Sequence, residues 1–246
     1  QNTTGIDNVA VGLYALNANT TASNNVAVGK SALTANTTGT ANVAVGNSSG
    51  DALTTGHYNT MVGHGSLGAD TTGTRSVAVG MQALAAQNFT SETSVYNVAV
   101  GFNAGLSVTT GTINTLIGGL AGDALTIGNS NVAVGYNTLT TEVAGDRSTA
   151  IGMGALALQT NASTVDVYNT AVGYNAGAAV TTGTGNTFVG GLAGDGTQSG
   201  AVNTAVGYKA LSAICGDGNT AVGVEALNAS TNNRNTALGY HAGRVM

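Results

Sequence analysis

The chain has 246 residues, with 38 glycines, no proline, one cysteine and a formal net charge of −5. Only 7% of the residues are charged while 42% are hydrophobic, which excludes a disordered chain, because disorder needs more charge and less valine. A single cysteine excludes an intrachain disulfide framework. Only six Lys and Arg residues are present, which argues against nucleic-acid binding. The sequence contains no run of about 20 consecutive apolar residues, so no membrane-spanning helix is predicted.

One pentapeptide, Asn-(Val/Thr)-Ala-Val-Gly with few departures, recurs along the whole chain. Of the 13 spacings between its 14 copies, nine are 17 residues, two are 21 and two are 16. Such a period predicts a solenoid in which each repeat makes one turn and stacks on the next. The copies begin at Asn8, Asn25, Asn42, Asn59, Ser76, Asn97, Asn114, Asn131, Ser148, Asn169, Asn186, Asn203, Asn219 and Asn235.

Each repeat is predicted to form two short strands followed by a polar turn. In the first copy, β-branched residues within 8–11 favour extended backbone, Gly12 permits a bend, and a second strand is expected through Ala15 and Leu16. The missing prolines fit a hydrogen-bond ladder at every turn. We therefore predict an all-β fold, a parallel β-roll or β-solenoid of 14 turns with about 17 residues and two strands per turn, as a single repeat domain over 1–246 with open, uncapped ends.

Three columns of the repeat are predicted to carry the structure. The asparagines are expected to stack as an amide ladder along the axis, the aliphatic residues to form the strands, and the glycines to supply the bend. Representative members of these columns are Asn25, Val28, Gly29, Asn131, Val134, Gly135, Asn203, Val206 and Gly207.

Alternation along the strand also bears on assembly. Val9 and Val11 point to one side and Ala10 to the other, so both sides are apolar. A solenoid turn has only one interior, and the second side therefore needs other cover. We expect a homo-oligomer, with a trimer as the natural closed choice for a fibre, and end-to-end stacking because the ends carry no capping repeats.

The two long copies are related by a shift of 72 residues. Each inserts four residues, within 85–96 and 158–168, and extra residues in a solenoid bulge outward as loops, often on the binding face. At each long copy serine replaces the column asparagine and an arginine precedes it. Arg75 and Arg147 are therefore expected either to reach across the broken ladder or simply to aid solubility.

Two kinds of residue are candidates for contact with a receptor. Asparagines in glycosylation-type sequons lie in the long copies, and tyrosines follow several column glycines, where they are expected either to stack on sugars or proteins or to pack against neighbouring turns. These candidate receptor contacts are Asn88, Asn161, Tyr136, Tyr174, Tyr208 and Tyr240.

The repeats Asn-Thr-Ala-Val-Gly-Tyr-Asn-Ala-Gly (169–177) and Asn-Thr-Ala-Val-Gly-Tyr-Lys-Ala-Leu (203–211) resemble repeats of bacteriophage tail-fibre proteins. They are also similar to the head repeats of trimeric autotransporter adhesins, although those repeats are shorter. The resemblance covers the whole chain. It implies an extracellular, elongated homotrimeric β-roll that projects from a virion or a cell surface and contacts a host glycan or protein. It carries no receptor-binding residue onto this sequence.

No catalytic, cofactor or metal site is expected. Gly29-Lys30-Ser31 matches the end of a P-loop, but Asn24 stands where its first glycine is required. His57 and His64 lie in adjacent turns without an evident third ligand. Cys215 is expected to be a buried small hydrophobe, because no base is placed beside it.

We therefore predict a structural fibre protein rather than an enzyme, most simply a phage tail fibre used in host attachment. The alternatives are a cell-surface adhesin or an extracellular filament whose subunits stack head to tail. A more remote alternative is an ice-binding solenoid with a flat threonine array, although the Thr-Thr pairs of the turns are interrupted at Ile127, Val143 and Gln198.

Overall fold

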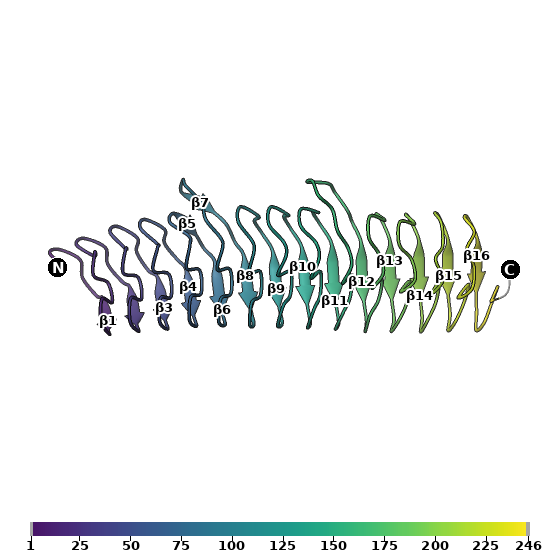
Figure 1. Ribbon diagram of the computed structural model, residues 1–246, viewed down its shortest axis with the longest axis horizontal. Helices are drawn as coiled ribbons and strands as arrows, with labels where there is room; N and C mark the ends of the chain where they lie inside the picture. The colour runs from purple at the N-terminus through teal and green to yellow at the C-terminus, as the bar shows by residue number, and fades with distance from the viewer. Residues whose placement is uncertain (1, 245–246) are drawn as a thin grey trace. The chain divides into compact units, whose positions relative to one another are not determined.

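The computed structural model describes residues 2–244. The chain divides into two compact units, an N-terminal unit of residues 1–127 and a C-terminal unit of residues 128–246. Each unit is a stack of turns on a parallel sheet (Figure 1). Residues 2–244 contain strands, bends and turns but no helix, so no helix of this part of the chain can span a membrane. The predicted all-β solenoid is confirmed.

Each recurring strand is three residues long and occupies the second to fourth positions of the pentapeptide. In the N-terminal unit these strands are β1 (Val9–Val11), β2 (Val26–Val28), β3 (Val43–Val45), β4 (Thr60–Val62), β6 (Val77–Val79), β8 (Val98–Val100) and β9 (Thr115–Ile117). In the C-terminal unit they are β10 (Val132–Val134), β11 (Thr149–Ile151), β12 (Thr170–Val172), β13 (Thr187–Val189), β14 (Thr204–Val206), β15 (Thr220–Val222) and β16 (Thr236–Leu238). Two further strands of two residues, β5 (Gly73–Thr74) and β7 (Thr93–Ser94), accompany the first long turn.

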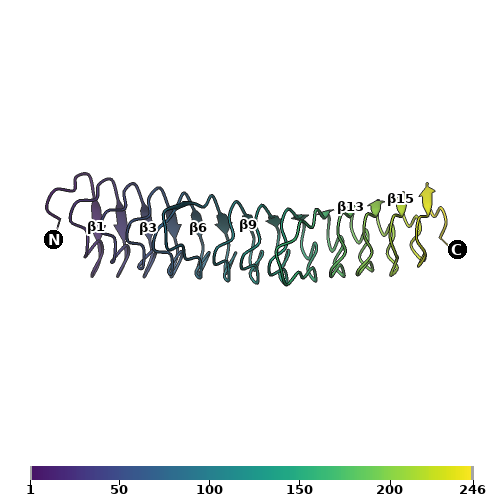
Figure 2. The same ribbon diagram turned by 90° about the horizontal axis from the view of Figure 1, so that it is seen from above.

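Within each unit every recurring strand lies beside the strand one turn away (Figure 2). The two pair in parallel, with each residue opposite its equivalent, as Val26 is opposite Val43. Val26 pairs with Val43 across a spacing of 17, whereas Val77 pairs with Val98 across 21. Thr204 pairs with Thr220 across 16. The three spacings therefore keep one register, because the extra or missing residues are absorbed outside the strands.

Within residues 2–244 the second strand that was predicted through the segment after each bend does not form. After each strand the backbone alternates into the left-handed region, as at Gly12 (φ 130°), Tyr14 (φ 63°) and Leu16 (φ 49°), so the segment through Ala15 and Leu16 curls instead of extending. Hydrogen bonds between turns continue there regardless, as from Leu33 N to the Ser49 carbonyl (3.1 Å). The prediction of two strands per turn was wrong because backbone pairing persists without extended dihedral angles.

Two constraints require glycine at the last position of the pentapeptide: its backbone dihedral angle and the close approach of the next turn. Gly29 has φ 138°, a conformation that residues with a Cβ rarely adopt. A Cβ on Gly29 would also lie 2.3 Å from the carbonyl oxygen of Gly46 in the next turn. The stacked glycines therefore let the corners of successive turns approach closely.

The middle residue of each strand faces the interior. Ala27 is fully buried, while Val26 and Val28 on either side of it are half-buried and point outward, as the strand alternation predicts. The core of each turn thus lies between the alanine column and the residues after the bend, such as Ala32 and Leu33, which are also fully buried.

Larger residues in the alanine column are matched by glycines opposite them. In the N-terminal unit a Cβ on Gly50 would lie 2.5 Å from the sulfur of Met61. In the C-terminal unit, Cβ atoms on Gly177 and Gly194 would lie 2.8 and 2.5 Å from ring carbons of Phe188. Interiors are packed to crystal-like density, so each large side chain needs such a gap across the turn.

The asparagine column forms a ladder of a different kind from the one predicted. The Asn25 carbonyl Oδ1 accepts from the backbone N–H of Asn42 (3.0 Å), and its Nδ2 donates to the Gly39 carbonyl (2.9 Å). The ladder is therefore mainly side chain to backbone. At the 16-residue spacings side-chain amides also bond each other along the column, as where Asn219 Nδ2 donates to Asn203 Oδ1 (3.1 Å).

Candidate functional site

The two long turns bulge outward from their units, as the sequence predicts (Figure 1). In the N-terminal unit the loop is tied back by the pairing of β7 with β5, which places Ser94 opposite Thr74. In the C-terminal unit an isolated parallel bridge places Asp166 opposite Asp146. These pairs are related by the shift of 72 residues, so the two loops are anchored in the same register.

A buried polar network anchors the N-terminal loop from inside. Asp70 is fully buried, and its carboxylate accepts from the backbone N–H of Gly73 (3.0 Å), from that of Phe89 (3.1 Å) and from Gln87 Nε2 (2.6 Å). Gln87 also donates to the Ser76 hydroxyl (3.1 Å) and accepts from Asn97 Nδ2 (2.9 Å). The glutamine therefore fills the gap that Ser76 leaves in the asparagine ladder.

The C-terminal loop has the same network with a longer acid. Glu142 is fully buried, and its carboxylate accepts from Gln159 Nε2 (2.8 Å) and from Asn161 Nδ2 (2.9 Å). It also accepts from four backbone N–H groups, those of Val143, Ala144, Gly145 and Asn161. Gln159 donates to the Ser148 hydroxyl (3.0 Å) and accepts from Asn169 Nδ2 (2.9 Å).

Neither acid nor glutamine was among the predicted site residues, although the sequence carries a signal for them. Each serine in the asparagine column has an acid six residues before it and a glutamine eleven residues after it. Of the two alternatives given for Arg75 and Arg147, crossing the broken ladder is wrong, because Gln87 and Gln159 occupy that place. Arg75 instead donates from Nη1 to the Ser94 hydroxyl (2.6 Å) at the outer corner of its unit.

The candidate glycosylation asparagines are only partly available. Asn88 is exposed, but its Oδ1 accepts from the Thr71 hydroxyl (3.3 Å). Asn161 is half-buried and its amide is held by Glu142. A third sequon, Asn-Thr-Thr over 36–38, lies outside the long copies; its Asn36 is fully buried, so this side chain belongs to the interior.

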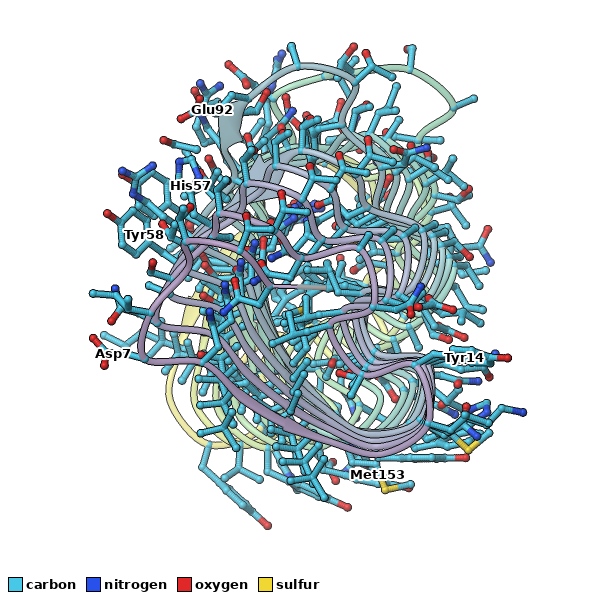
Figure 3. The ribbon with its side chains drawn as sticks, turned by 90° about the vertical axis from the view of Figure 1, so that its left-hand side faces the viewer. Asp7, Tyr14, His57, Tyr58, Glu92 and Met153 are labelled. Carbon is cyan, nitrogen blue, oxygen red and sulfur yellow. The ribbon has the colours of Figure 1, made fainter. Side chains whose placement is uncertain are left out.

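An aromatic and charged corner lies beside the N-terminal loop. The Arg75 guanidinium carbon sits 5.5 Å from the ring centroid of Tyr58 and 5.9 Å from that of Tyr96, within the range of cation–π attraction. His57 packs edge-on against Tyr58, and its Nε2 lies 3.0 Å from the Glu92 carboxylate of the loop. Tyr58, His57 and Glu92 project from the same side of the unit (Figure 3).

The C-terminal unit has a related corner with an internal ion pair. Arg147 pairs with the carboxylate of Asp166, and the Tyr168 hydroxyl donates to the other oxygen of that carboxylate (3.0 Å). The Arg147 guanidinium also lies 5.7 Å from the ring centroid of Tyr168. Asp166 stands where the N-terminal unit has Ser94.

The tyrosines predicted as receptor contacts form an exposed ridge in the C-terminal unit. Tyr136, Tyr174, Tyr208 and Tyr240 are 49–73% exposed. They occupy every second turn, with Met153, Gly191 and Val224 at the same position in the turns between. Among residues 2–244 no ring pair joins two of these tyrosines, because a turn without an aromatic side chain separates each from the next.

Both units expose an uncharged strand face. In the N-terminal unit Val43 and Val45 are 36% and 37% exposed, and in the C-terminal unit Val189 and Val206 are 38% and 37% exposed. The first outward column differs between the units. It is mostly valine in the N-terminal unit, whereas threonine fills it from Thr149 to Thr236 in the C-terminal unit.

The other sequence candidates have structural surroundings. Cys215 is buried, and its Sγ lies 3.2 Å from the Thr197 hydroxyl. Burial raises the pKa of the Cys215 thiol, which leaves it a poor nucleophile at neutral pH. Within residues 2–244 no three His, Cys, Asp or Glu side chains gather as metal ligands.

The chain matches no protein-family model, no curated protein and no solved structure in the three comparisons made.

Proposed function

We propose that the chain is a structural, non-enzymatic protein whose stacked turns form the shaft of an extracellular homotrimeric fibre. Its biological use is attachment to a host surface, as in a phage tail fibre. The observation that carries this proposal is the uncharged outward strand face of both units, in which the two outward columns hold only Val, Thr, Ile and Leu. In the N-terminal unit this face is mostly valine, and a contiguous apolar surface of this kind is typical of an interaction site.

A second copy of the same chain is the partner that fits this face best. Its strands repeat at the same spacing of about 4.8 Å, so each turn of one copy meets a turn of the other. Val26 and Val28 of one turn and Val43 and Val45 of the next then meet equivalent side chains without a charge to desolvate. The number of copies, three, comes from the resemblance to fibre repeats.

Light scattering of the purified chain, combined with size-exclusion chromatography, tests the assembly. We expect a trimer mass, and we expect Val43→Lys in the N-terminal unit to reduce it, because a buried lysine without a partner is strongly unfavourable. Thr38→Lys is the matched control, since Thr38 is exposed in a polar turn and the substitution should leave the mass unchanged. A monomeric wild-type chain, or an unaltered trimer of Val43→Lys, contradicts the proposal.

The alternative of a cell-surface adhesin or filament differs in how the copies assemble. Electron microscopy of the same preparation separates the two, because discrete particles of one length support the fibre shaft. Indefinite filaments support end-to-end stacking instead.

The C-terminal strand face favours a second candidate function, ice binding. Six consecutive turns present threonine in one outward column, beside an aliphatic column: Thr149, Thr170, Thr187, Thr204, Thr220 and Thr236. A flat, uncharged and regular array of methyl and hydroxyl groups can order water at its surface. These are not the turn threonines that the sequence suggested. Thermal hysteresis of the purified chain that disappears in Thr204→Lys supports this function, and a chain without hysteresis excludes it.

A further inference from the structure

The corner around Arg75 and the corner around Arg147 have different residues at one equivalent position, Ser94 and Asp166. This position decides whether the arginine forms an ion pair with a carboxylate of its own unit. In the C-terminal unit the carboxylate of Asp166 receives Arg147 on one oxygen and the Tyr168 hydroxyl on the other. In the N-terminal unit the corresponding donors are the Arg75 guanidinium and the Tyr96 hydroxyl, but Ser94 stands in the place of Asp166. Within residues 2–244 no carboxylate forms an ion pair with Arg75.

Arg75 is held ready for a ligand by its neighbours. Its guanidinium lies between the rings of Tyr58 and Tyr96, and Nη1 donates to the hydroxyls of Thr74 (3.1 Å) and Ser94 (2.6 Å). An arginine has five N–H donors in a rigid fork, so Nη2 and Nε are left to bind a carboxylate. Fixing the side chain in advance lowers the entropy lost on binding.

The rings beside Arg75 indicate what kind of carboxylate the corner would accept. Tyr58 and Tyr96 are 56% and 54% exposed, so each keeps an apolar surface and a hydroxyl in solvent. The apolar C–H face of a sugar ring packs on such aromatic surfaces. Glu92, the only acid of the loop 85–96, contacts His57 Nε2 (3.0 Å) and forms no ion pair with Arg75 within residues 2–244.

We propose that the Arg75 corner of the N-terminal unit binds a carboxylate-bearing sugar. The guanidinium and the Tyr96 hydroxyl hold the carboxylate as Arg147 and Tyr168 hold Asp166, and the Tyr58 ring packs against the sugar. The corner of the C-terminal unit is closed to such a ligand because Asp166 already occupies the equivalent position. This site would supply the sugar contact of the proposed attachment function. Its biological use rests on that proposed function, whereas the binding of the sugar depends only on the residues of the corner.

The test is a titration of the full chain with two acidic sugars, trigalacturonate and 3′-sialyllactose, followed by calorimetry or by NMR of the tyrosine rings. The methyl ester of trigalacturonate serves as the neutral control. We expect saturable binding of at least one acidic probe at one site per chain, and at least tenfold weaker binding of the ester. Failure of both acidic probes to bind at millimolar concentration would overturn the site.

Exchanging the two units' residues makes the test specific. Ser94→Asp installs the internal carboxylate of the other unit and should weaken binding at least tenfold, with the circular dichroism and the unfolding midpoint unchanged. Asp166→Ser should free Arg147 but add at most a weaker second site, because Ser130 stands where the N-terminal unit has Tyr58. Wild-type affinity in Ser94→Asp, or in Arg75→Gln, contradicts the proposal.

Binding and assembly are measured separately, so the two proposals fail separately. A monomer that binds the acidic sugar refutes the trimeric shaft and keeps the site. A trimer that binds neither probe keeps the shaft and refutes the site.

Discussion

The long turn of the N-terminal unit and that of the C-terminal unit meet the same structural demand with different side chains. Both break the asparagine ladder with a serine and restore it with a glutamine, Gln87 in one unit and Gln159 in the other. The buried acid that holds the glutamine differs in length between the units. Asp70 accepts three hydrogen bonds, whereas the longer Glu142 accepts six. A buried carboxylate needs hydrogen bonds on both oxygens, and each unit supplies them.

Outside, the same two turns diverge more freely. Ser94 in one unit and Asp166 in the other occupy one backbone register, yet one corner leaves its arginine open and the other neutralises it. Either residue changes the free energy of unfolding little, because ion pairs between exposed side chains contribute little to stability. Hydrogen bonding therefore dictates the interior of the long turn, whereas the side chains on its exterior vary between the units.

The largest expected effect comes from removing the buried acids. At about 1 kcal/mol for each donor that loses its acceptor, Glu142→Ala should lower the free energy of unfolding by about 6 kcal/mol and Asp70→Ala by about 3 kcal/mol. Urea unfolding measures both. Thr164→Ala, at an exposed position in the C-terminal loop, is the control without effect. Equal losses for the two acids would show that the number of donors does not set the effect.

Large residues in the alanine column give the next effect. Phe188→Ala restores the commonest residue of its column, yet it leaves a cavity opposite Gly177 and Gly194, so we expect a loss of about 3–5 kcal/mol. Met61→Ala in the N-terminal unit faces a glycine at Gly50 and should lose about 2–5 kcal/mol.

A compensating variant checks the cause of that loss. Leucine occupies the column of Gly194 in other turns with the same left-handed backbone, as at Leu211 (φ 55°). Adding Gly194→Leu to Phe188→Ala should therefore recover part of the stability in urea unfolding. If the second substitution destabilises further, the cavity does not explain the first.

The exposed ion pair gives a smaller effect. Arg147 and Asp166 are about half exposed, so Asp166→Ser should cost less than about 1 kcal/mol, and the difference should shrink in high salt. Thermal unfolding at two ionic strengths measures it. A loss of several kcal/mol would mean that the C-terminal corner supports its loop rather than merely closing a site.

The smallest effect concerns the thiol of the C-terminal unit. Burial raises the pKa of Cys215, so the stability that this group contributes is complete below the pKa of the unfolded thiol and is lost as the pH rises through the folded value. At neutral pH the thiol should react with a maleimide far more slowly in the native chain than in urea, and faster as the pH rises. Equal rates in the native and unfolded chains would contradict its burial.

Much of the architecture followed from the sequence because one period repeats along it. The spacing of the column glycines predicts the turns, and strand alternation predicts that Val26 and Ala27 point to opposite sides of the strand. That Ala27 is the one facing inward came from the structure. The second strand was predicted wrongly at Leu16, because propensity does not reveal a left-handed backbone in a non-glycine residue. The acids Asp70 and Glu142 were missed because their only signal in the sequence is a spacing to the column serine and to the glutamine, and because some of their donors come from the next turn.

The candidate site shows the same division. The sequence predicted where the chain bulges, since four inserted residues in a fixed period have no place in the stack, and it placed Arg75 and Arg147 at the two long copies. Its candidate tyrosines did not include Tyr58 or Tyr96, which lie beside Arg75. Only the tertiary structure decided that Arg75 lies between two tyrosine rings, and that Ser94 and Asp166 are equivalent. Residues about 20 positions apart become neighbours when turns stack in register, and the backbone pairing inside each loop then fixes which side chain an arginine meets.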